Sequence, residues 1–362
     1  VMESSMLREG ESNYLGAVML RGGAGGCAFA DVSTGEVCAA AFEKDAATHI
    51  QNELSRFRPR ECVLSPDAML NRDIRDALEK RLGCRVEPSG GRFDAENARK
   101  AIAAQYGENA PDTDEMTTLA LGALLAYLAD AQRGDMSQLR VPDIFTRGRY
   151  MELDAAARRN LELTENLRTG EKRGSLLWVL DKTKTPMGGR MLRSWVERPL
   201  LSPAAIRRRL AAVEELYRDN VGRAELIEKL KSIGDIQRLT SRAVYGAANG
   251  RDMLALGGYL AAVPDLFAQL GKYQSGMLRS IAATEPLERL CQLLRRAICD
   301  EPPFSVREGG ILRAGYSEEV DRLRNIRNNG AKCVAELEAR EKERTGIKKL
   351  KIGYNKVFGY YI

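Results

Sequence analysis

The sequence of 362 residues is 44% hydrophobic and 29% charged, with a formal net charge of +6. This balance excludes a largely disordered chain, and the length exceeds what one ordinary hydrophobic core needs, so we expect two or more domains. Basic and acidic residues are interleaved. The positive charge therefore permits contact with a polyanion, but by itself it favours a solvated surface of mixed charge.

The cysteine and histidine content excludes the commonest zinc sites. Seven cysteines contain no C-x-x-C pair, and His49 is the single histidine. An odd number of cysteines without regular spacing is typical of reduced thiols in a cytosolic protein. No signal peptide is recognisable, and no apolar run reaches the roughly 20 residues of a membrane span. We therefore predict a cytoplasmic protein with no metal site and no membrane partner.

The first 132 residues alternate between strand-like and helix-like patterns. Three strand-like runs come first and are joined by turns at 21–26 and 33–35, where glycine supports a hairpin. Shorter helical and strand-like segments then alternate. This order predicts an α/β domain of ribonuclease-H-like type over residues 1–132. The predicted strands are 13–20, 26–32, 36–42, 62–65 and 84–87, and the predicted helices are 46–57, 74–82, 95–106 and 116–131.

Residues 133–149 are polar, contain glycine and proline, and are predicted to form a linker. Residues 150–344 are almost entirely helical by pattern. One helix has clear limits, because Thr185 can cap it, Pro186 suits its first position, and Arg198 precedes the proline that ends it. Further helices are predicted to start at Ser202 and to cover 226–233, 252–270 with an interruption at Pro264, 277–298 and 318–345.

The last segment, 345–362, changes from a helical to an alternating pattern. Over residues 349–354 a period of two predicts a strand with one apolar and one basic face. Ammonium groups along such a face can follow DNA phosphates without reading bases. The alternative is an edge strand whose lysines prevent pairing with other chains, and periodicity alone favours it. The apolar face holds Leu350, Ile352 and Tyr354, and the basic face holds Lys349 and Lys351.

Three blocks of the chain resemble one protein family. The most specific is 181–200, and it is supported by 153–163 and 345–362. In this order and spacing the blocks resemble the middle part of the MutS family of DNA mismatch-repair proteins. The resemblance implies a connector domain of ribonuclease-H-like fold over 1–132, all-α lever and core helices over 150–344, and the start of a small β clamp over 345–362.

The resemblance also implies contact with DNA. In the family the clamp grips the DNA backbone, and this reverses the preference for an edge strand. The positions of this chain that match the clamp segment, and that are therefore candidate DNA-binding residues, are Lys348, Lys349, Lys351, Asn355 and Lys356.

The resemblance further implies a longer parent protein. Intact members carry a mismatch-reading domain with a Phe-x-Glu motif and an ATPase domain with a Walker A loop, and neither motif occurs in this sequence. We therefore expect a middle fragment without enzymatic activity or a cofactor of its own, from a parent that uses ATP and Mg²⁺. The parent is expected to bind mismatched double-stranded DNA as a homodimer and to recruit a MutL-type partner through the connector. The fragment would link the mismatch-binding and ATPase domains, with apolar helix surface left uncovered.

Two alternatives to a mismatch-repair protein are a MutS paralogue acting in recombination and a metal-dependent nuclease. The nuclease interpretation depends on Asp31 on an early strand, with Glu36, Glu61 or Asp67 as further metal ligands. Asp31 beside a Ser-Thr-Gly turn is more simply a turn-stabilising residue. The family's connector also has this fold without nuclease chemistry, so we expect no catalytic residue.

Three other features favour structural interpretations. The glycines at 22, 23, 25 and 26 precede no helix and belong to no Walker A pattern, so they predict a hairpin turn and no phosphate loop. His49 is expected at the surface or half-buried, without partners. The three arginines at 207–209 lie on the polar side of an amphipathic helix and are expected to be solvated or to form salt bridges.

Overall fold

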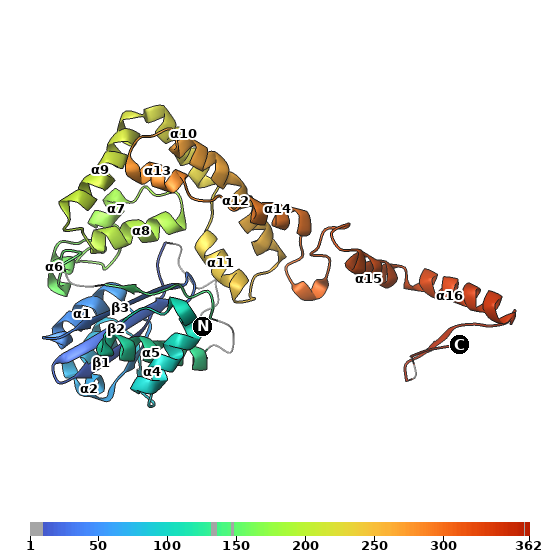
Figure 1. The fold of residues 1–362 in the computed structure, drawn as a ribbon, viewed down its shortest axis with the longest axis horizontal. Helices are drawn as coiled ribbons and strands as arrows, with labels where there is room; N and C mark the ends of the chain where they lie inside the picture. Colours follow the sequence, from blue (N-terminus) through green and yellow to red (C-terminus); the bar gives the residue numbers. More distant parts are fainter. Residues whose placement is uncertain (1–9, 132–135, 146–147, 358) are drawn as a thin grey trace.

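The computed structural model describes residues 10–131, 136–145, 148–357 and 359–362. A sheet with helices on both faces lies at one end, a set of helices packs beside it, and an arm of two helices leads to a C-terminal hairpin (Figure 1). The predicted fold class, an α/β region followed by helices and a small β element, is confirmed.

The sheet has six strands in the order β5-β4-β1-β2-β3-β6. β1, β2 and β3 are antiparallel, whereas β4 pairs in parallel with β1, β5 with β4 and β6 with β3. The predicted opening of three antiparallel strands is therefore confirmed. The strands are β1 (Leu15–Arg21), β2 (Ala24–Asp31), β3 (Glu36–Phe42), β4 (Glu61–Leu64), β5 (Arg85–Pro88) and β6 (Asp143–Ile144).

Glycines make the two opening hairpins possible. β1 and β2 are joined by Gly22 and Gly23, whose φ angles of 55° and 90° are rarely adopted by residues with side chains. Gly35, at φ 73°, ends the second turn. Gly26 serves packing instead, because a Cβ there would lie 2.4 Å from the carbonyl oxygen of Met116. The hairpin interpretation is confirmed, with a first turn shorter than predicted.

Helices cover both faces of this sheet. α1 (Ala46–Phe57), α2 (Pro66–Leu70) and α3 (Arg72–Asp76) bury apolar side chains against one face. α4 (Ala95–Tyr106) and α5 (Glu115–Ala131) do so against the other. Burying a leucine contributes about 1.5–3 kcal/mol relative to exposure, so α5 makes the larger contribution to this face of the sheet. Its buried leucines are Leu119, Leu121, Leu124, Leu125 and Leu128.

The helix predicted over 74–82 starts earlier and changes its winding. α3 begins at Arg72, because the Asn71 side chain accepts a hydrogen bond from the backbone N–H of Ile74. From Ala77 to Arg81 the chain then forms a turn of π-helix in which Leu78 stays buried.

Strand β6 lies inside the segment 133–149 that was predicted as a linker. It pairs in parallel with β3, and the N–H of Phe145 donates to the carbonyl oxygen of Ala39 at 3.0 Å. Leu139 and Phe145 are buried against the sheet. A strand of two residues is too short for a periodic pattern, so the local sequence does not predict it.

The helical region confirms the predicted limits of α8 (Pro186–Glu197). The Thr185 hydroxyl accepts a hydrogen bond from the N–H of Gly188 at 3.0 Å, and the helix ends before Arg198. The other helices of this region are α6 (Ala155–Asn160), α7 (Leu176–Leu180), α9 (Pro203–Arg218), α10 (Asn220–Lys231), α11 (Ile236–Val244), α12 (Gly250–Leu270), α13 (Gly276–Ala282) and α14 (Glu288–Ala297).

α12 is continuous through Pro264, so the predicted interruption is wrong. Before the proline, Leu256 and Leu260 share a core with Leu294 of α14. After it, Leu270 belongs to a second core with α10 and α13. Because both halves of the helix are held by packing, the missing proline N–H removes a hydrogen bond without ending the helix.

Two helices predicted as continuous are divided. The stretch 277–298 is broken between α13 and α14, where Pro286 disfavours helical backbone before it and Leu287 has φ 55°. The stretch 318–345 is divided at Asn329 into α15 (Glu318–Asn328) and α16 (Gly330–Thr345). An asparagine followed by glycine favours such a turn.

Among the described residues, α12 is the one helix long and apolar enough to cross a membrane. The sequence pattern missed it because Asp252, Pro264 and Asp265 interrupt the apolar run. Length and composition alone are weak evidence, since a helix in the core of a globular protein meets the same criterion. α12 packs against α10, α11, α13 and α14.

An apolar surface is uncovered on the helical region. The predicted apolar face of α9 carries Ile206, Leu210 and Val213, and the last two are 58% and 60% exposed. Trp178 of α7 and Met191 of α8 are exposed as well. The expectation of uncovered apolar helix surface is therefore confirmed, and such patches favour association with another apolar surface.

Candidate nucleic-acid interface

The candidate DNA-binding residues lie at the end of an arm. α15 and α16 extend away from the other helices, and the chain then turns back into the hairpin of β7 (Gly353–Asn355) and β8 (Gly359–Tyr361) (Figure 1). Gly346, at φ 73°, ends α16 in the left-handed conformation that suits glycine. The arm thus presents the C-terminal segment far from the sheet.

All five candidate side chains are exposed. Four of them are lysines within nine consecutive residues, 348–356, a stretch without an acidic residue. Lys348 and Lys349 lie in the turn after α16, Lys351 lies in extended chain before β7, Asn355 ends β7, and Lys356 lies in the hairpin turn.

The strand predicted over 349–354 is wrong in position. The strand begins only at Gly353 and pairs with β8. The N–H of Ile352 donates to Oε2 of Glu338 on α16 at 3.1 Å, so it is not available to a neighbouring strand. Lys349 and Lys351, which were expected on a basic strand face, therefore precede the strand. They lie in the segment that connects α16 to β7.

Glu338 ties the segment to α16. Its Oε1 accepts a hydrogen bond from Nζ of Lys342 at 2.6 Å. The hydrogen bonds from Lys342 and from the N–H of Ile352, together with the charges of Lys342 and Lys351, hold the pKa of Glu338 below its ordinary value. A carboxylate that is occupied in this way competes less with DNA phosphates for the remaining lysines.

Asn355 shapes the hairpin. Its Oδ1 accepts a hydrogen bond from the N–H of Val357 at 2.8 Å, as asparagine commonly does in turns. The rings of Tyr354 and Tyr360 lie across the hairpin with centroids 5.1 Å apart. Within the part of the chain that the structure describes, Lys356 in this turn has no carboxylate at ion-pair distance. Its ammonium group is therefore free for a phosphate.

Asp31 has the turn-stabilising role that the sequence favours. Its Oδ1 accepts hydrogen bonds from the N–H and the hydroxyl of Ser33 at 2.9 and 2.7 Å, and its Oδ2 accepts one from the N–H of Asn13 at 3.0 Å. Both oxygens are engaged in local structure. Over the described residues, no group of three or more His, Cys, Asp or Glu side chains could hold a metal ion.

His49 and the three arginines at 207–209 differ in part from what the sequence predicts. His49 on α1 is half-buried as predicted, but the expectation that it lacks a partner is wrong, because its ring stacks on Phe42 with centroids 5.2 Å apart. At 207–209 the first two arginines are exposed as expected. Arg209 instead lies over the Trp195 ring, 3.6 Å from its centroid, and burial lowers its pKa.

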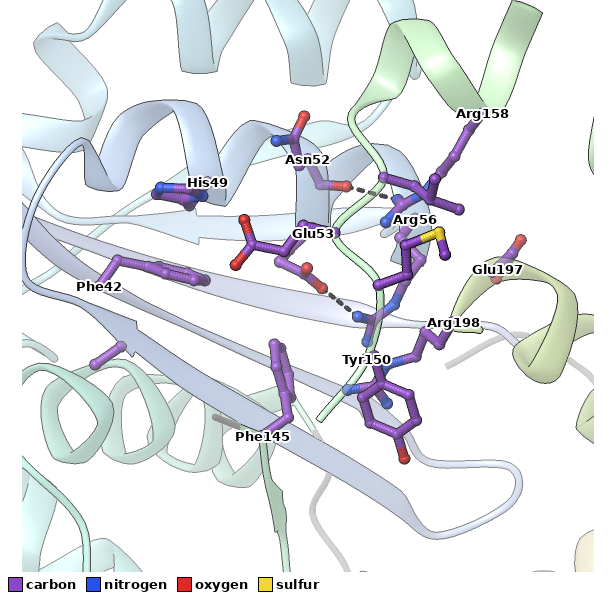
Figure 2. Close-up of a pocket in the computed structure, with 14 residues that line it drawn as sticks. Phe42, His49, Asn52, Glu53, Arg56, Phe145, Tyr150, Arg158, Glu197 and Arg198 are labelled. Carbon is purple, nitrogen blue, oxygen red and sulfur yellow. Dashed lines mark hydrogen bonds and ion pairs between the residues drawn. The ribbon is translucent and has the colours of Figure 1, made fainter. Parts of the chain in front are cut away.

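A cavity of about 80 Å³ lies where the α/β region meets the helices. Arginines from three elements surround it: Arg56 on α1, Arg158 on α6, and Arg198 after α8 (Figure 2). Arg158 donates to the carbonyl oxygen of Asn52 at 2.9 Å. Burial lowers the pKa of Arg158 and of Arg198, and the nearby charge of Arg56 lowers both further.

The sequence does not predict a functional role for the residues that line this cavity. Arg198 is recognisable only as the residue before a helix-ending proline, and Phe145 lies in the predicted linker. The one available signal is an aromatic residue within a polar stretch, and it does not indicate a partner.

Most of the chain matches two family models. The family model described as MutS domain II matches residues 13–140, and the one described as MutS domain III matches residues 156–350. The DNA mismatch repair protein MutS of Symbiobacterium thermophilum is 40% identical, over 100% of this chain and 42% of its own length. That of Desulforamulus reducens is 39% identical over the same shares. The chain thus spans about two fifths of these relatives.

Proposed function

This chain belongs to the MutS family of DNA mismatch repair proteins, and from that premise we propose that its C-terminal segment contacts the backbone of duplex DNA. In this proposal Lys348, Lys349, Lys351 and Lys356 bind phosphates, and Asn355 holds the turn that positions Lys356. Contacts of this kind supply affinity without base readout. Binding then depends on charge and is equal for matched and mismatched duplexes.

The observation that supports the proposal is the exposed basic segment at the end of the arm. Its lysines are accessible, and the described residues place no carboxylate at ion-pair distance from them. Phosphates would therefore displace mainly water and counterions from these ammonium groups, and at Lys351 they would also compete with the charge of Glu338. The segment lies at the end of the arm formed by α15 and α16, away from the sheet (Figure 1).

We further propose that the chain links two activities of a longer protein. We assign mismatch reading and Mg²⁺-dependent ATP hydrolysis to parts of that protein outside this chain, and no enzymatic activity or cofactor to the chain itself. The longer protein would act in the cytoplasm as a homodimer and recruit a MutL-type partner through the α/β region. The helices between that region and the hairpin would carry movement from one part to the other.

Fluorescence anisotropy with two duplexes of equal length, one fully matched and one with a single mismatch, tests the DNA-binding proposal. We expect weak binding at low salt, equal for both duplexes and abolished as salt increases, because counterion release drives it. A several-fold preference for the mismatched duplex would mean that a base-reading element lies within this chain. Absence of binding at low salt would contradict the proposal altogether.

A further inference from the structure

Aromatic rings and guanidinium groups alternate across the boundary between the sheet and the helices. The order is Phe57, Arg56, Phe145, Arg198 and Tyr150, which we call the junction stack, and Figure 2 shows the last four around one cavity. The Arg56 guanidinium lies 3.8 Å from the ring centroid of Phe57 and 5.0 Å from that of Phe145. That of Arg198 lies 4.7 Å from the centroid of Phe145 and 4.4 Å from that of Tyr150.

The first half of the junction stack belongs to the α/β region. Phe57 ends α1 and stacks on Phe29 of β2 with centroids 4.1 Å apart. Arg56 forms an ion pair with Glu53 on the same helix. Phe145 follows β6 and is hydrogen-bonded through its backbone to β3. These three members are buried and move with the sheet.

The second half belongs to the helical region. Arg198 is the residue directly after α8, and Tyr150 forms an antiparallel bridge with Leu200. The adjacent backbone adds a hydrogen bond from the N–H of Met151 to the carbonyl oxygen of Pro199 at 2.8 Å. The end of α8 and the chain around Tyr150 are therefore one unit, and the Arg198 side chain reaches from it to the α/β region.

Other contacts also cross this boundary. From α6, Arg158 donates to the carbonyl oxygen of Asn52 on α1 at 2.9 Å, and the N–H of Ala155 donates to the Oδ1 of Asn52 at 3.2 Å. The Arg58–Glu165 pair is open to solvent on both sides, and pairs of this kind are screened by salt. Asp143 lies 3.9 Å from Arg198, which is long for an ion pair. The side chain of Arg198 is 11% exposed, and cation–π contacts are stronger when they are desolvated in this way.

We propose that Arg198 couples the helices to the α/β region, with the junction stack as the contact that passes a displacement of α8 to the sheet. This inference rests on the linking role proposed above. A planar guanidinium contacts rings on both of its faces, and a lysine ammonium cannot do so. The two regions keep one relative orientation while the stack is intact, and they separate when Arg198 leaves the two rings.

Distances between spin labels test this coupling in the whole chain. The labels are attached to cysteines introduced at the exposed positions Ala104 on α4 and Ala224 on α10. Cys299 and Cys333 are replaced by serine, and the other native cysteines are buried. Pulsed electron paramagnetic resonance of this reference protein is expected to give one narrow distance distribution at low and at high salt, because the Arg56 and Arg198 side chains of the stack are 5% and 11% exposed.

Three variants at the stack and one control distinguish the explanations. Arg198→Ala removes the guanidinium and Arg198→Lys keeps only its charge, and both are expected to broaden the distribution. The broadening should be larger at high salt, where the Arg58–Glu165 pair is screened. Tyr150→Leu removes one ring and should also broaden the distance distribution. Arg209→Ala is the matched control, because it removes a guanidinium from a ring within the helical region, and it should leave the distribution narrow.

A narrow distribution in Arg198→Ala overturns the proposal. So does a narrow distribution in Arg198→Lys, because the charge facing Asp143 would then be sufficient. If Arg198→Ala does not fold, Arg198→Lys and Tyr150→Leu decide in the same way. DNA affinity measured on the same samples separates the two proposals: absence of binding in the reference protein contradicts the proposed function, whereas narrow distributions with normal binding contradict only the coupling.

Discussion

The guanidinium of Arg190 and the carboxylate of Asp235 form a bidentate ion pair between α8 and the start of α11, with Nη1–Oδ2 and Nη2–Oδ1 distances of 2.7 and 2.8 Å. The two side chains are 7% and 16% exposed. Arg190 also donates to Gln237, and Asp235 accepts the N–H of Arg238 as the cap of α11. The pair therefore fixes the body of α8, and Arg198 follows its last residue.

Removal of one partner should be costly. Arg190→Met leaves the Asp235 carboxylate buried without its main counter-ion, and we expect the free energy of unfolding to fall by about 3 kcal/mol. Urea unfolding followed by circular dichroism measures the change. The control is Arg218→Met on α9, which removes an exposed pair with Glu214 and should stay within about 0.5 kcal/mol. Equal decreases in the free energy of unfolding of the two variants would show that the buried pair stabilises the fold no more than the exposed pair does.

The same pair predicts a pH dependence. Burial alone would raise the pKa of Asp235, but the hydrogen bonds and charge of Arg190 and the N–H of Arg238 outweigh it and lower the pKa. The folded value then lies below that of the unfolded chain, near 3.9. The stabilisation is complete above about pH 4 and is lost as pH falls through the folded value.

We therefore expect the stability difference between the unchanged protein and Asp235→Asn to be largest near neutral pH and to shrink below about pH 4. Urea unfolding at a series of pH values measures it. A difference that grows as the pH falls would mean that the pKa of Asp235 is raised and that burial dominates.

The uncovered apolar face of α9 predicts self-association. Leu210→Glu with Val213→Glu should shift the chain toward monomer, because charge on this face prevents its burial against a second copy. Sedimentation velocity at several concentrations measures the shift. Leu70→Glu on α2 is the control, since Leu70 is 83% exposed in a different region. The same distribution of species in all three proteins would exclude this face as the contact.

The chain itself is expected to release no phosphate from ATP with Mg²⁺, because no Walker A pattern occurs in its sequence. A coupled assay on protein purified from cells without any MutS protein measures the release. Turnover that scales with protein concentration and survives further purification would refute this expectation.

Local patterns predicted the elements whose causes are local. The hairpin at Gly22 and Gly23 and the capped start of α8 at Thr185 follow from residues within a few positions of one another. The strand predicted near Lys349 is wrong in position because the N–H of Ile352 donates to Glu338, which lies on the preceding helix. Periodicity contains no information about a hydrogen bond of that kind.

The junction stack could not be predicted for a related reason. Arg56, Phe145 and Arg198 are distant in sequence and lie in or directly after three different elements, so their contact exists only after the sheet and the helices have packed. Each has a plausible local role, as a helix-end cation, a linker aromatic and a residue before proline. The family resemblance indicated the C-terminal segment as a candidate region, but it contained no indication of this boundary.

The central proposal, that lysines of the C-terminal segment bind DNA phosphates, depends on charge and therefore on salt. Lys349→Ala with Lys351→Ala is the test variant. Lys182→Ala with Lys184→Ala is the matched control, because it removes two exposed lysines at the same spacing from the loop between α7 and α8. Both variants should keep their stability within about 0.5 kcal/mol, since exposed lysines bury little surface.

The most direct measurement is the slope of log affinity against log salt concentration for a fully matched duplex. We predict that the test variant flattens the slope by up to about 1.8, at about 0.9 for each phosphate that a lysine no longer neutralises, and that the control leaves it unchanged. A mismatched duplex should give the same result. An unchanged slope in the test variant would contradict the DNA-contact assignment, and stronger light scattering beside it would show that these exposed lysines instead limit self-association.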